Sequence, residues 1–117
     1  MSMTAWISQL RKGLVEFCIL LVVGSEESYG YSLVQRLRRA PNLSFTEGTV
    51  YPALARLIEE GLIRATERPS PMGPPRRYLS LTPSGKRRLT EMSHHWLGVC
   101  SSVETLMQAL KKGDSDA

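Results

Sequence analysis

The sequence predicts a mainly α-helical protein of the α+β class, with four helices and one β-hairpin. Apolar residues recur at spacings of three and four over most of the chain, which is typical of amphipathic helices. Two strand-like segments flank one loop rich in proline and glycine, the pattern of a hairpin with a protruding tip. The chain has 117 residues, enough for one domain with a modest core and an appended helix.

The first two helices are expected before residue 41. The first covers about residues 4–23, because Gly24 suits the position after a helix C-terminus. Ser28 is suited to cap a second helix over residues 29–40, which Pro41 ends. The apolar stripe of the first helix consists of Ile7, Leu10, Leu14, Phe17 and Leu21.

The third helix has two contrasting faces. Across residues 46–61, TEGTVYPALARLIEEG, apolar residues recur at i, i+4, i+7 and i+8 from Val50 and form one stripe. The opposite side is small and polar with one long cation, so nothing bulky prevents it from lying against another surface. That side carries Gly48, Thr49, Pro52, Ala55 and Arg56.

Local signals also predict the ends of the third helix. Ser44 together with Glu47 fits the S-x-x-E capping box, so the helix is expected to begin near Ser44 or Thr46. Pro52 removes one intrahelical hydrogen bond and is expected to bend the helix. Gly61 is expected to end it.

A β-hairpin is expected after the third helix, with strands at residues 62–67 and 76–81. The segment between them, residues 69–75 (PSPMGPP), has too many prolines to pair and is expected to protrude as a loop. Thr82 is suited to cap the fourth helix. Pro83 then takes the first helical position, where its missing N–H is harmless.

The fourth helix carries an apolar seam longer than a small domain requires. Seven apolar residues follow one another at alternating spacings of three and four, which describes three heptads over about 32 Å of helix. We therefore expect residues 83–112 to form a coiled-coil-like dimerisation helix after a domain over residues 1–82, with a disordered tail at 113–117. The seam residues are Leu89, Met92, Trp96, Val99, Val103, Leu106 and Leu110.

The charge is unevenly distributed. The formal net charge is +4, but residues 1–88 contain thirteen Lys or Arg against seven Asp or Glu. Residues 89–117 contain two against four. The basic excess therefore belongs to the part of the chain that would meet a polyanion.

The sequence predicts a cytoplasmic protein without a membrane partner. The longest unbroken apolar run, residues 17–23, is far shorter than the roughly 20 residues that span a bilayer. Glu16 interrupts the pattern of a signal peptide. Cys18 and Cys100 lie in apolar helical segments and are expected to be buried free thiols.

A helix with a slim outer face followed by an arginine-bearing hairpin is the arrangement of a winged helix-turn-helix, which grips duplex DNA. Thr49 and Arg56 are suited to bond base edges or phosphates. Tyr51 either packs at the domain edge or presents its hydroxyl to a phosphate. The alternative for this helix is a plain solvent-exposed face. Further cations lie in the hairpin and at the start of the fourth helix, where they would contact the phosphate backbone of DNA. Alternatively, they would only be solvated or would protect a strand edge from aggregation. These cations are Arg64, Arg68, Arg76, Arg77, Lys86, Arg87 and Arg88.

Other chemistry has little support. His94 and His95 lie near Cys100, but adjacent histidines on a helix point in different directions and no CxxC or HxxxH spacing accompanies them. Neither a metal site nor another cofactor is therefore expected, and the motifs of common enzymes are missing from the sequence. Trp96 lies at the centre of the seam, where it either forms dimer core or flanks a slot for a planar aromatic ligand.

Seven short segments together resemble the PadR family of transcriptional regulators. The resemblance extends over nearly all of residues 8–112, and its most specific parts are the G-T-x-Y-P element and the G-P-P-R-[KR]-Y element of the hairpin. Leu79 departs from the family pattern, in which an aromatic residue often follows the first tyrosine of that element. The segments are LRKGL (10–14), YGYSL (29–33), EGTVYPAL (47–54), RL (56–57), GLI (61–63), GPPRRY (73–78) and LTPSG (81–85).

The resemblance implies a winged-helix homodimer that represses transcription at an inverted-repeat operator. The helix after the hairpin would form the dimer with help from the first helix, and an effector, where one exists, would bind near that interface. Two alternatives remain: a regulator that responds to a planar aromatic effector at Trp96, and a winged-helix module that binds an acidic protein partner. The expected DNA-contacting residues are Thr46, Glu47, Gly48, Thr49, Tyr51, Pro52, Arg56, Arg76 and Arg77.

Overall fold

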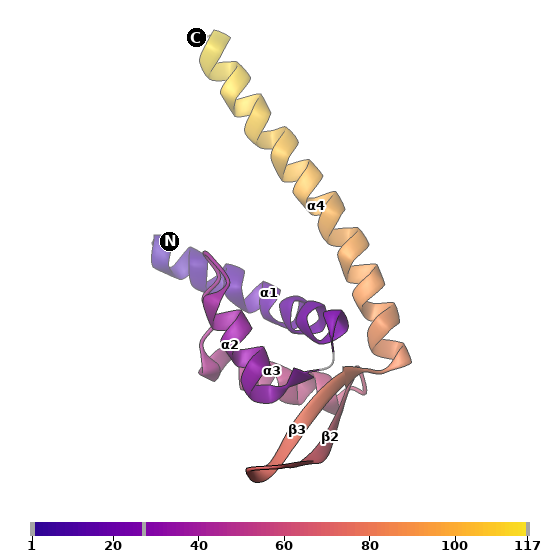
Figure 1. Cartoon of the computed structure of the whole chain (residues 1–117). Helices are drawn as coiled ribbons and strands as arrows, with labels where there is room; N and C mark the ends of the chain where they lie inside the picture. The colour runs from indigo at the N-terminus through magenta and orange to yellow at the C-terminus, as the bar shows by residue number, and fades with distance from the viewer. Residues whose placement is uncertain (1, 27, 117) are drawn as a thin grey trace.

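The computed structural model describes residues 2–26 and 28–116, which form a helical body, a β-hairpin and a long final helix (Figure 1). The hairpin and the final helix project from the body in different directions. The predicted class, mainly helical with a winged helix-turn-helix and one C-terminal helix, is confirmed. The elements in chain order are α1 (Met3–Ser25), β1 (Ser28–Tyr29), α2 (Gly30–Arg39), α3 (Glu47–Glu59), β2 (Ile63–Ser70), β3 (Gly73–Leu81) and α4 (Pro83–Asp116).

The core is built around the C-terminal half of α1, against which α2, α3 and β3 pack. The apolar stripe predicted for this helix is wrong in part, because Leu10 and Leu21 are exposed. The helix is apolar on more than one side, and the elements that follow cover Leu14 and Phe17 of the predicted stripe together with apolar residues outside it. The buried residues of α1 are Val15, Phe17, Ile19, Leu20, Val22 and Val23.

Gly24 lies inside α1 and does not end it, since the helix continues to Ser25. A Cβ at Gly24 would lie 2.8 Å from a methyl carbon of Leu89 and 3.0 Å from one of Leu81. The glycine is therefore explained by the close approach of β3 and α4 to α1. The predicted role as a helix stop was wrong because this contact is invisible in the local sequence.

A short strand replaces the predicted cap of α2. Ser28 and Tyr29 form β1, and they pair in antiparallel register with Leu79 and Tyr78 of β3. Helix α2 begins at Gly30, with Tyr29 at its N-cap position and no side-chain cap hydrogen bond. The prediction of a Ser28 cap was wrong because pairing with a distant strand decides the backbone conformation here.

Helix α3 begins at Glu47, with Thr46 at the N-cap position. The alternative start at Ser44 is excluded, because Asn42 and Ser44 have φ angles of 64° and 44°, in the left-handed region. The turn they form brings Phe45 into the core, where its side chain is almost fully buried. This buried aromatic residue was not predicted.

The buried face and the end of α3 agree with the prediction. The helix continues through Pro52 to Glu59, and Gly61 follows its end with a φ of 76°, a conformation that favours glycine. One face is buried against the body while Ile58 is half-buried at its edge. The buried residues are Val50, Ala53, Leu54 and Leu57.

The sheet has the strand order β1-β3-β2 and is antiparallel throughout. The hairpin strands are longer than predicted, because pairing continues to Ser70 and Gly73. The loop expected over residues 69–75 is therefore wrong. Its prolines are tolerated because β1 spans only two residues, so the outer part of β3 has a free edge where a missing N–H costs little. A register shift next to Pro69 accommodates the remaining irregularity. We call the β2–β3 hairpin the wing.

The start of α4 agrees with the prediction. The hydroxyl of Thr82 accepts a hydrogen bond from Gly85 N–H at 3.0 Å and donates one to the carbonyl of Gly61 at 2.6 Å. Pro83 is the first helical residue. A Cβ at Gly85 would overlap the carbonyl oxygen of Leu62, so α4 is seated directly on the turn that joins α3 to β2.

Helix α4 then leaves the body, and the molecule is 65 Å long as a result. Every described side chain from residue 94 to residue 113 is exposed. The helix reaches Asp116 and so includes most of the stretch predicted as a disordered tail, residues 113–117. Ala117 lies outside the described residues.

Candidate nucleic-acid interface

The outer face of α3 is open to a partner. Gly48, Tyr51, Pro52 and Ala55 are exposed. A Cβ at Gly48 would meet only the hydroxyl oxygen of Thr46, at 3.9 Å, so the chain itself does not cover this face. The backbone of α3 can therefore approach another surface closely.

Polar groups gather at the N-terminus of α3. The hydroxyl oxygens of Thr46 and Thr49 lie 3.1 Å apart and share a hydrogen bond. The carboxylate of Glu47 accepts a hydrogen bond from Arg38 of α2 at 3.4 Å. Arg38 was not singled out from the sequence, because only the fold brings the end of α2 beside this site. A hollow of about 620 Å³ opens here and is lined by Arg38, Ser44, Phe45, Thr46, Glu47 and Gly48.

Arg56 takes a different position from the other predicted contacts. Its Nε donates to a carboxylate oxygen of Glu16 in α1 at 3.1 Å, and the two side chains are 54% and 39% exposed. An ion pair this exposed contributes roughly 0–1 kcal/mol, so a phosphate could compete for the guanidinium group. The structure thus gives Arg56 a partner within the protomer that the sequence did not predict.

The wing carries four exposed arginines, Arg64, Arg68, Arg76 and Arg77. Arg68 is the register partner of Arg76 across the two strands, and Arg77 is opposite an acidic residue, Glu67. Successive side chains of a strand point to opposite faces. Arg76 and Arg77, which were predicted to act together, therefore lie on different faces of the wing.

Two tyrosines hold the arginines on one face of the wing. The guanidinium carbon of Arg76 lies 4.7 Å from the ring centroid of Tyr29, and that of Arg68 lies 4.6 Å from the ring centroid of Tyr78. The two rings are 5.7 Å apart at an interplanar angle of 67°. This arrangement is not predicted by the sequence, because Tyr29 becomes a neighbour of Tyr78 only through the unpredicted pairing of β1 with β3.

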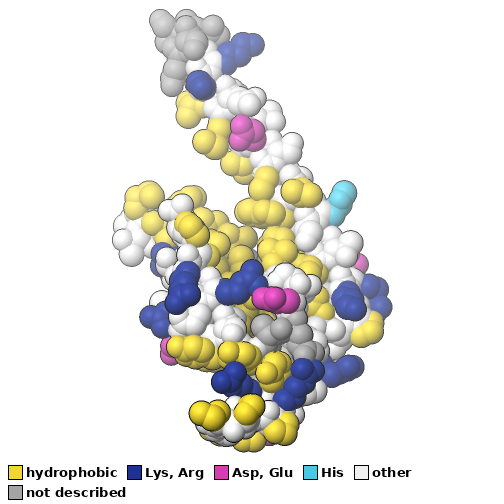
Figure 2. Space-filling view, viewed as in Figure 1, with side chains coloured by type: hydrophobic (Ala, Val, Ile, Leu, Met, Phe, Trp, Pro, Cys, Tyr) yellow, Lys and Arg dark blue, Asp and Glu magenta, His cyan; other side chains and the backbone are white. Residues whose placement is uncertain are grey.

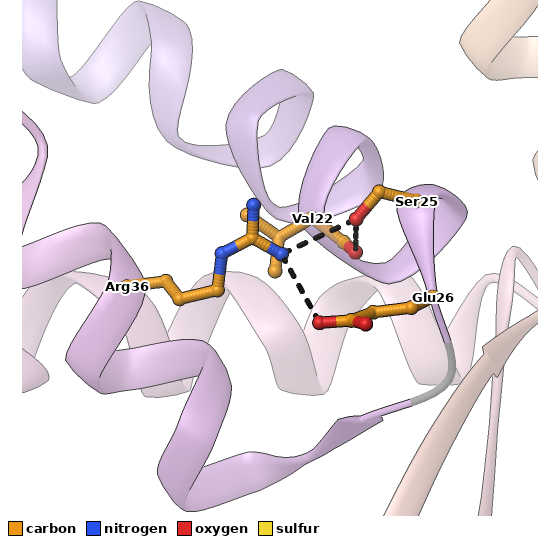
Figure 3. Close-up of polar contacts among 4 residues, drawn as sticks. All are labelled: Val22, Ser25, Glu26 and Arg36. Atoms are coloured by element: carbon orange, nitrogen blue, oxygen red, sulfur yellow. Dashed lines mark hydrogen bonds and ion pairs between the residues drawn. The ribbon is translucent and has the colours of Figure 1, made fainter.

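The connection from α1 to α2 is held by one arginine of α2, as Figure 3 shows. Arg36 donates a hydrogen bond to the hydroxyl of Ser25 at 3.2 Å, and its guanidinium lies 3.7 Å from the carboxylate of Glu26. Ser25 in turn donates to the carbonyl of Val22 at 2.7 Å. These contacts tie α2 to the end of α1, immediately before β1.

The basic residues extend from the wing to the first turns of α4. Lys86, Arg87 and Arg88 are exposed there, and Arg87 donates a hydrogen bond to Ser84 at 3.1 Å. Figure 2 shows dark blue Lys and Arg side chains over the body and above the tip of the wing, with few acidic ones between them. This part of the molecule therefore presents a positive surface to a polyanion.

The apolar seam of α4 meets two different surroundings. Leu89 and Met92 pack against the core of the protomer itself. Trp96 contacts Phe17 of α1, with ring centroids 6.2 Å apart. Beyond this point the exposed fraction of the seam rises, from 37% at Trp96 to 70% at Leu106. Leu89 and Met92 of the predicted seam thus pack in the protomer core, and Trp96 is partly covered by α1. The later seam residues are more exposed within the described chain.

A cavity of about 330 Å³ lies between α1 and α4, beside Trp96. Its wall combines apolar and aromatic side chains with one cation, one carboxylate and one imidazole. That composition suits a small aromatic molecule with a polar edge. The lining residues are Gly13, Leu14, Phe17, Arg88, Glu91, Met92, His95 and Trp96.

The cysteines and histidines do not converge. Cys18 is half-buried, and burial raises the pKa of its thiol. Cys100 is exposed in the protomer, so the prediction that it is buried was wrong; the apolar segment around it belongs to the uncovered part of α4. Both thiols are free. Among the described residues, no three His, Cys, Asp or Glu side chains gather closely enough to hold a metal ion.

The open face of α3, the basic wing and the strand β1, which pairs with the wing and leads into α2, define a DNA-binding protein of the winged helix-turn-helix class. No helix in residues 2–26 or 28–116 combines the length and the hydropathy needed to cross a membrane.

Comparison with known proteins identifies the family. The sequence model of the PadR-like family of transcriptional regulators matches residues 19–91, so the chain belongs to that family. Its members are transcriptional regulators that bind DNA and are not enzymes.

Solved structures agree with this assignment. The chain is similar to a Streptococcus transcriptional regulator, with 42% identity, a TM-score of 0.74, and coverage of 84% of this chain and 96% of that chain. It is also similar to a PadR-like transcriptional regulator from Bacillus cereus, with 38% identity, a TM-score of 0.77, and coverage of 86% and 97%. An uncharacterized protein from Lysinibacillus sphaericus is 28% identical over 106 residues, which are 89% of this chain and 97% of that protein.

Proposed function

We propose that this PadR-like regulator acts in the cytoplasm as a homodimer that binds an inverted-repeat operator and represses transcription. One observation carries the proposal: the DNA-binding body continues into a long helix whose seam is apolar and exposed from Trp96 onward. A regulator built in this way needs a second copy to cover the seam. Two copies would then hold two α3 helices at a constant separation.

The amount of exposed apolar surface supports a dimer. Each Å² of apolar surface removed from water stabilises by about 25 cal/mol, and monomers rarely expose a continuous apolar patch of this kind. Helix α1 adds further exposed apolar side chains at its N-terminal half. A twofold interface would use the same surface on both copies. The proposed interface comprises Met3, Trp6, Leu10, Trp96, Val99, Val103, Leu106 and Leu110.

In the proposed complex, α3 enters the major groove and the wing follows the phosphate backbone. Half-sites should be about 10 bp apart or a multiple of that distance, since both copies approach the same side of the helix. Arg56 would break its ion pair with Glu16 and bind a phosphate instead. The proposed contacts are Thr46, Glu47, Gly48, Thr49, Tyr51, Pro52, Arg56, Arg76 and Arg77.

Three measurements test the proposal. Sedimentation at micromolar concentration should give a dimer, and selection of bound genomic fragments should recover a palindromic element. A reporter gene behind that element should lose expression when the protein is present. Monomers together with the absence of any palindrome would contradict the proposal, whereas bound DNA with increased reporter expression would change repression to activation.

A salt titration tests the wing. Arg76→Ala and Arg77→Ala should each weaken binding to all sequences. Each lost phosphate contact should also reduce the magnitude of the negative slope of log K against log salt by about 0.9. Lys112→Ala is the matched control, because this cation lies near the far end of α4. Unchanged affinity and slope in both wing variants would remove the wing from the interface.

The cavity between α1 and α4 supports a second candidate function, regulation by a planar aromatic effector. Because Trp96 lines this cavity and Trp6 is exposed elsewhere on α1, quenching of indole fluorescence should fall when Trp96 is replaced by Phe. Equal quenching in both proteins would contradict an effector at this place. The third possibility, docking of an acidic protein by the basic face, predicts no mobility shift with the DNA upstream of the gene.

A further inference from the structure

We infer that Tyr29 and Tyr78 are positioning residues for DNA binding, whose rings hold the guanidinium groups of Arg76 and Arg68 in place for the phosphate backbone. This inference rests on the proposed contact between the wing and DNA. It adds that the two tyrosines restrict the arginine side chains of the wing in the protein without DNA.

Four side chains form one continuous stack across the sheet. Tyr29 of β1 and Tyr78 of β3 are register partners, and their rings meet edge to face. Arg76 lies over the first ring and Arg68 over the second, both within the roughly 6 Å at which a ring face attracts a cation. Each arginine therefore has its own aromatic partner.

The stack compensates for an unfavourable pair. Arg68 and Arg76 face each other across β2 and β3, and like charges directly opposite in a sheet are destabilising. Attraction to two different rings offsets this repulsion and restricts both side chains. Less rotamer freedom is then lost when a phosphate is bound. Because a stacked guanidinium keeps its N–H groups at its edge, the exposed Arg76 remains able to donate to a phosphate while it lies over Tyr29.

The stack also connects the wing to the reading helices. Tyr29 immediately precedes α2, and Arg36 of α2 holds Ser25 and Glu26 on the other side of the same connection (Figure 3). The ring of Tyr29 is therefore anchored to the helix-turn-helix, and through Arg76 it orients the wing relative to α3. The arrangement uses ring faces and edges, so the hydroxyl groups are not required.

The experiment measures operator affinity and its salt dependence for the dimer carrying Tyr29→Leu, Tyr29→Phe, Arg76→Ala, or Tyr29→Leu together with Arg76→Ala. Tyr29→Leu should weaken binding about three- to tenfold, the size of one lost cation–ring contact. Tyr29→Phe should stay within about twofold. Arg76→Ala should cost less affinity in the Tyr29→Leu protein than in the wild type, because the tyrosine acts through the arginine.

The outcomes separate this inference from the function on which it rests. Wild-type affinity in Tyr29→Leu, or losses that simply add with Arg76→Ala, would overturn the positioning role while leaving the DNA contact of the wing intact. A loss in Tyr29→Phe equal to that in Tyr29→Leu would assign the hydroxyl to DNA and overturn it as well. If Arg76→Ala itself does not change operator affinity, the proposed contact of Arg76 with DNA is contradicted, and the positioning role of Tyr29 is contradicted with it. Thermal unfolding confirms that each variant is folded, and Tyr78→Leu, Tyr78→Phe and Arg68→Ala repeat the test should Tyr29→Leu not fold.

Discussion

Helices α3 and α4 carry similar apolar spacings but lie in opposite surroundings. In α3 the stripe that begins at Val50 packs against α1 and β2, and its members are buried except for the half-buried Ile58. In α4 the seam is covered only as far as Met92, and from Trp96 onward its side chains are exposed. Periodicity specifies which face of a helix is apolar, and it does not specify what covers that face. Substitutions in a buried stripe should therefore change the free energy of unfolding, whereas substitutions in an exposed stripe should change the affinity between protomers.

The largest expected effect is on α3. Leu57→Ala should lower the free energy of unfolding by about 2–5 kcal/mol, because it leaves a cavity in the core. Chemical denaturation at two protein concentrations measures this loss, which should be similar at both. Ala55→Ser, on the exposed face of the same helix, is the control and should change stability by less than about 0.5 kcal/mol. Equal losses in the two variants would contradict the assignment of faces.

The next effect concerns α4. Val103→Glu places a charge in the proposed dimer seam and should raise the dissociation constant of the dimer at least about tenfold, while the body keeps its near-ultraviolet circular dichroism. Sedimentation over a concentration series measures the change. Ser101→Glu adds the same charge on the opposite side of the helix and should leave the dimer unaltered. A Val103→Glu protein with an unchanged dissociation constant would exclude the seam as the dimer interface.

Helix α4 has one glycine where it contacts the body, Gly85, and another in its exposed part, Gly98. A Cβ at Gly98 would meet no atom within 4 Å, so Gly98→Ala should stabilise the helix by about 1 kcal/mol and raise the melting temperature by a few degrees. Gly85→Ala should do the opposite, because its Cβ would overlap the Leu62 carbonyl oxygen. Calorimetry compares the two variants. A melting temperature raised by both substitutions would show that the base of α4 is not seated on the body.

The smallest effect is a difference in labelling rate. At neutral pH the thiol of Cys18 should react with a thiol reagent about tenfold more slowly than that of Cys100, because burial both shields it and raises its pKa, which leaves less thiolate. Its rate should increase with pH toward that raised pKa. The variant Cys100→Ala should retain only the slow phase and Cys18→Ala only the fast one. A fast phase in Cys100→Ala would contradict the burial of Cys18.

The amino-acid sequence alone determined the features that neighbouring residues encode. Residues of one short segment indicate each of these features: the Thr82–Pro83 start of α4, the glycine after α3 and the two faces of α3. The family resemblance likewise depended on short motifs, and the family match confirmed it. Such signals are local, so they can be recognised in the sequence without knowledge of the fold.

Which distant segments meet depends on the packing of the whole chain. The pairing of Tyr29 with Tyr78, the ion pair of Arg56 with Glu16 and the side of α1 that faces the core each join residues far apart in the sequence. Several surfaces of these helices are apolar or charged enough to accept a partner. The choice among them is made by how all the elements pack together, because burial and pairing depend on the whole arrangement and not on one segment.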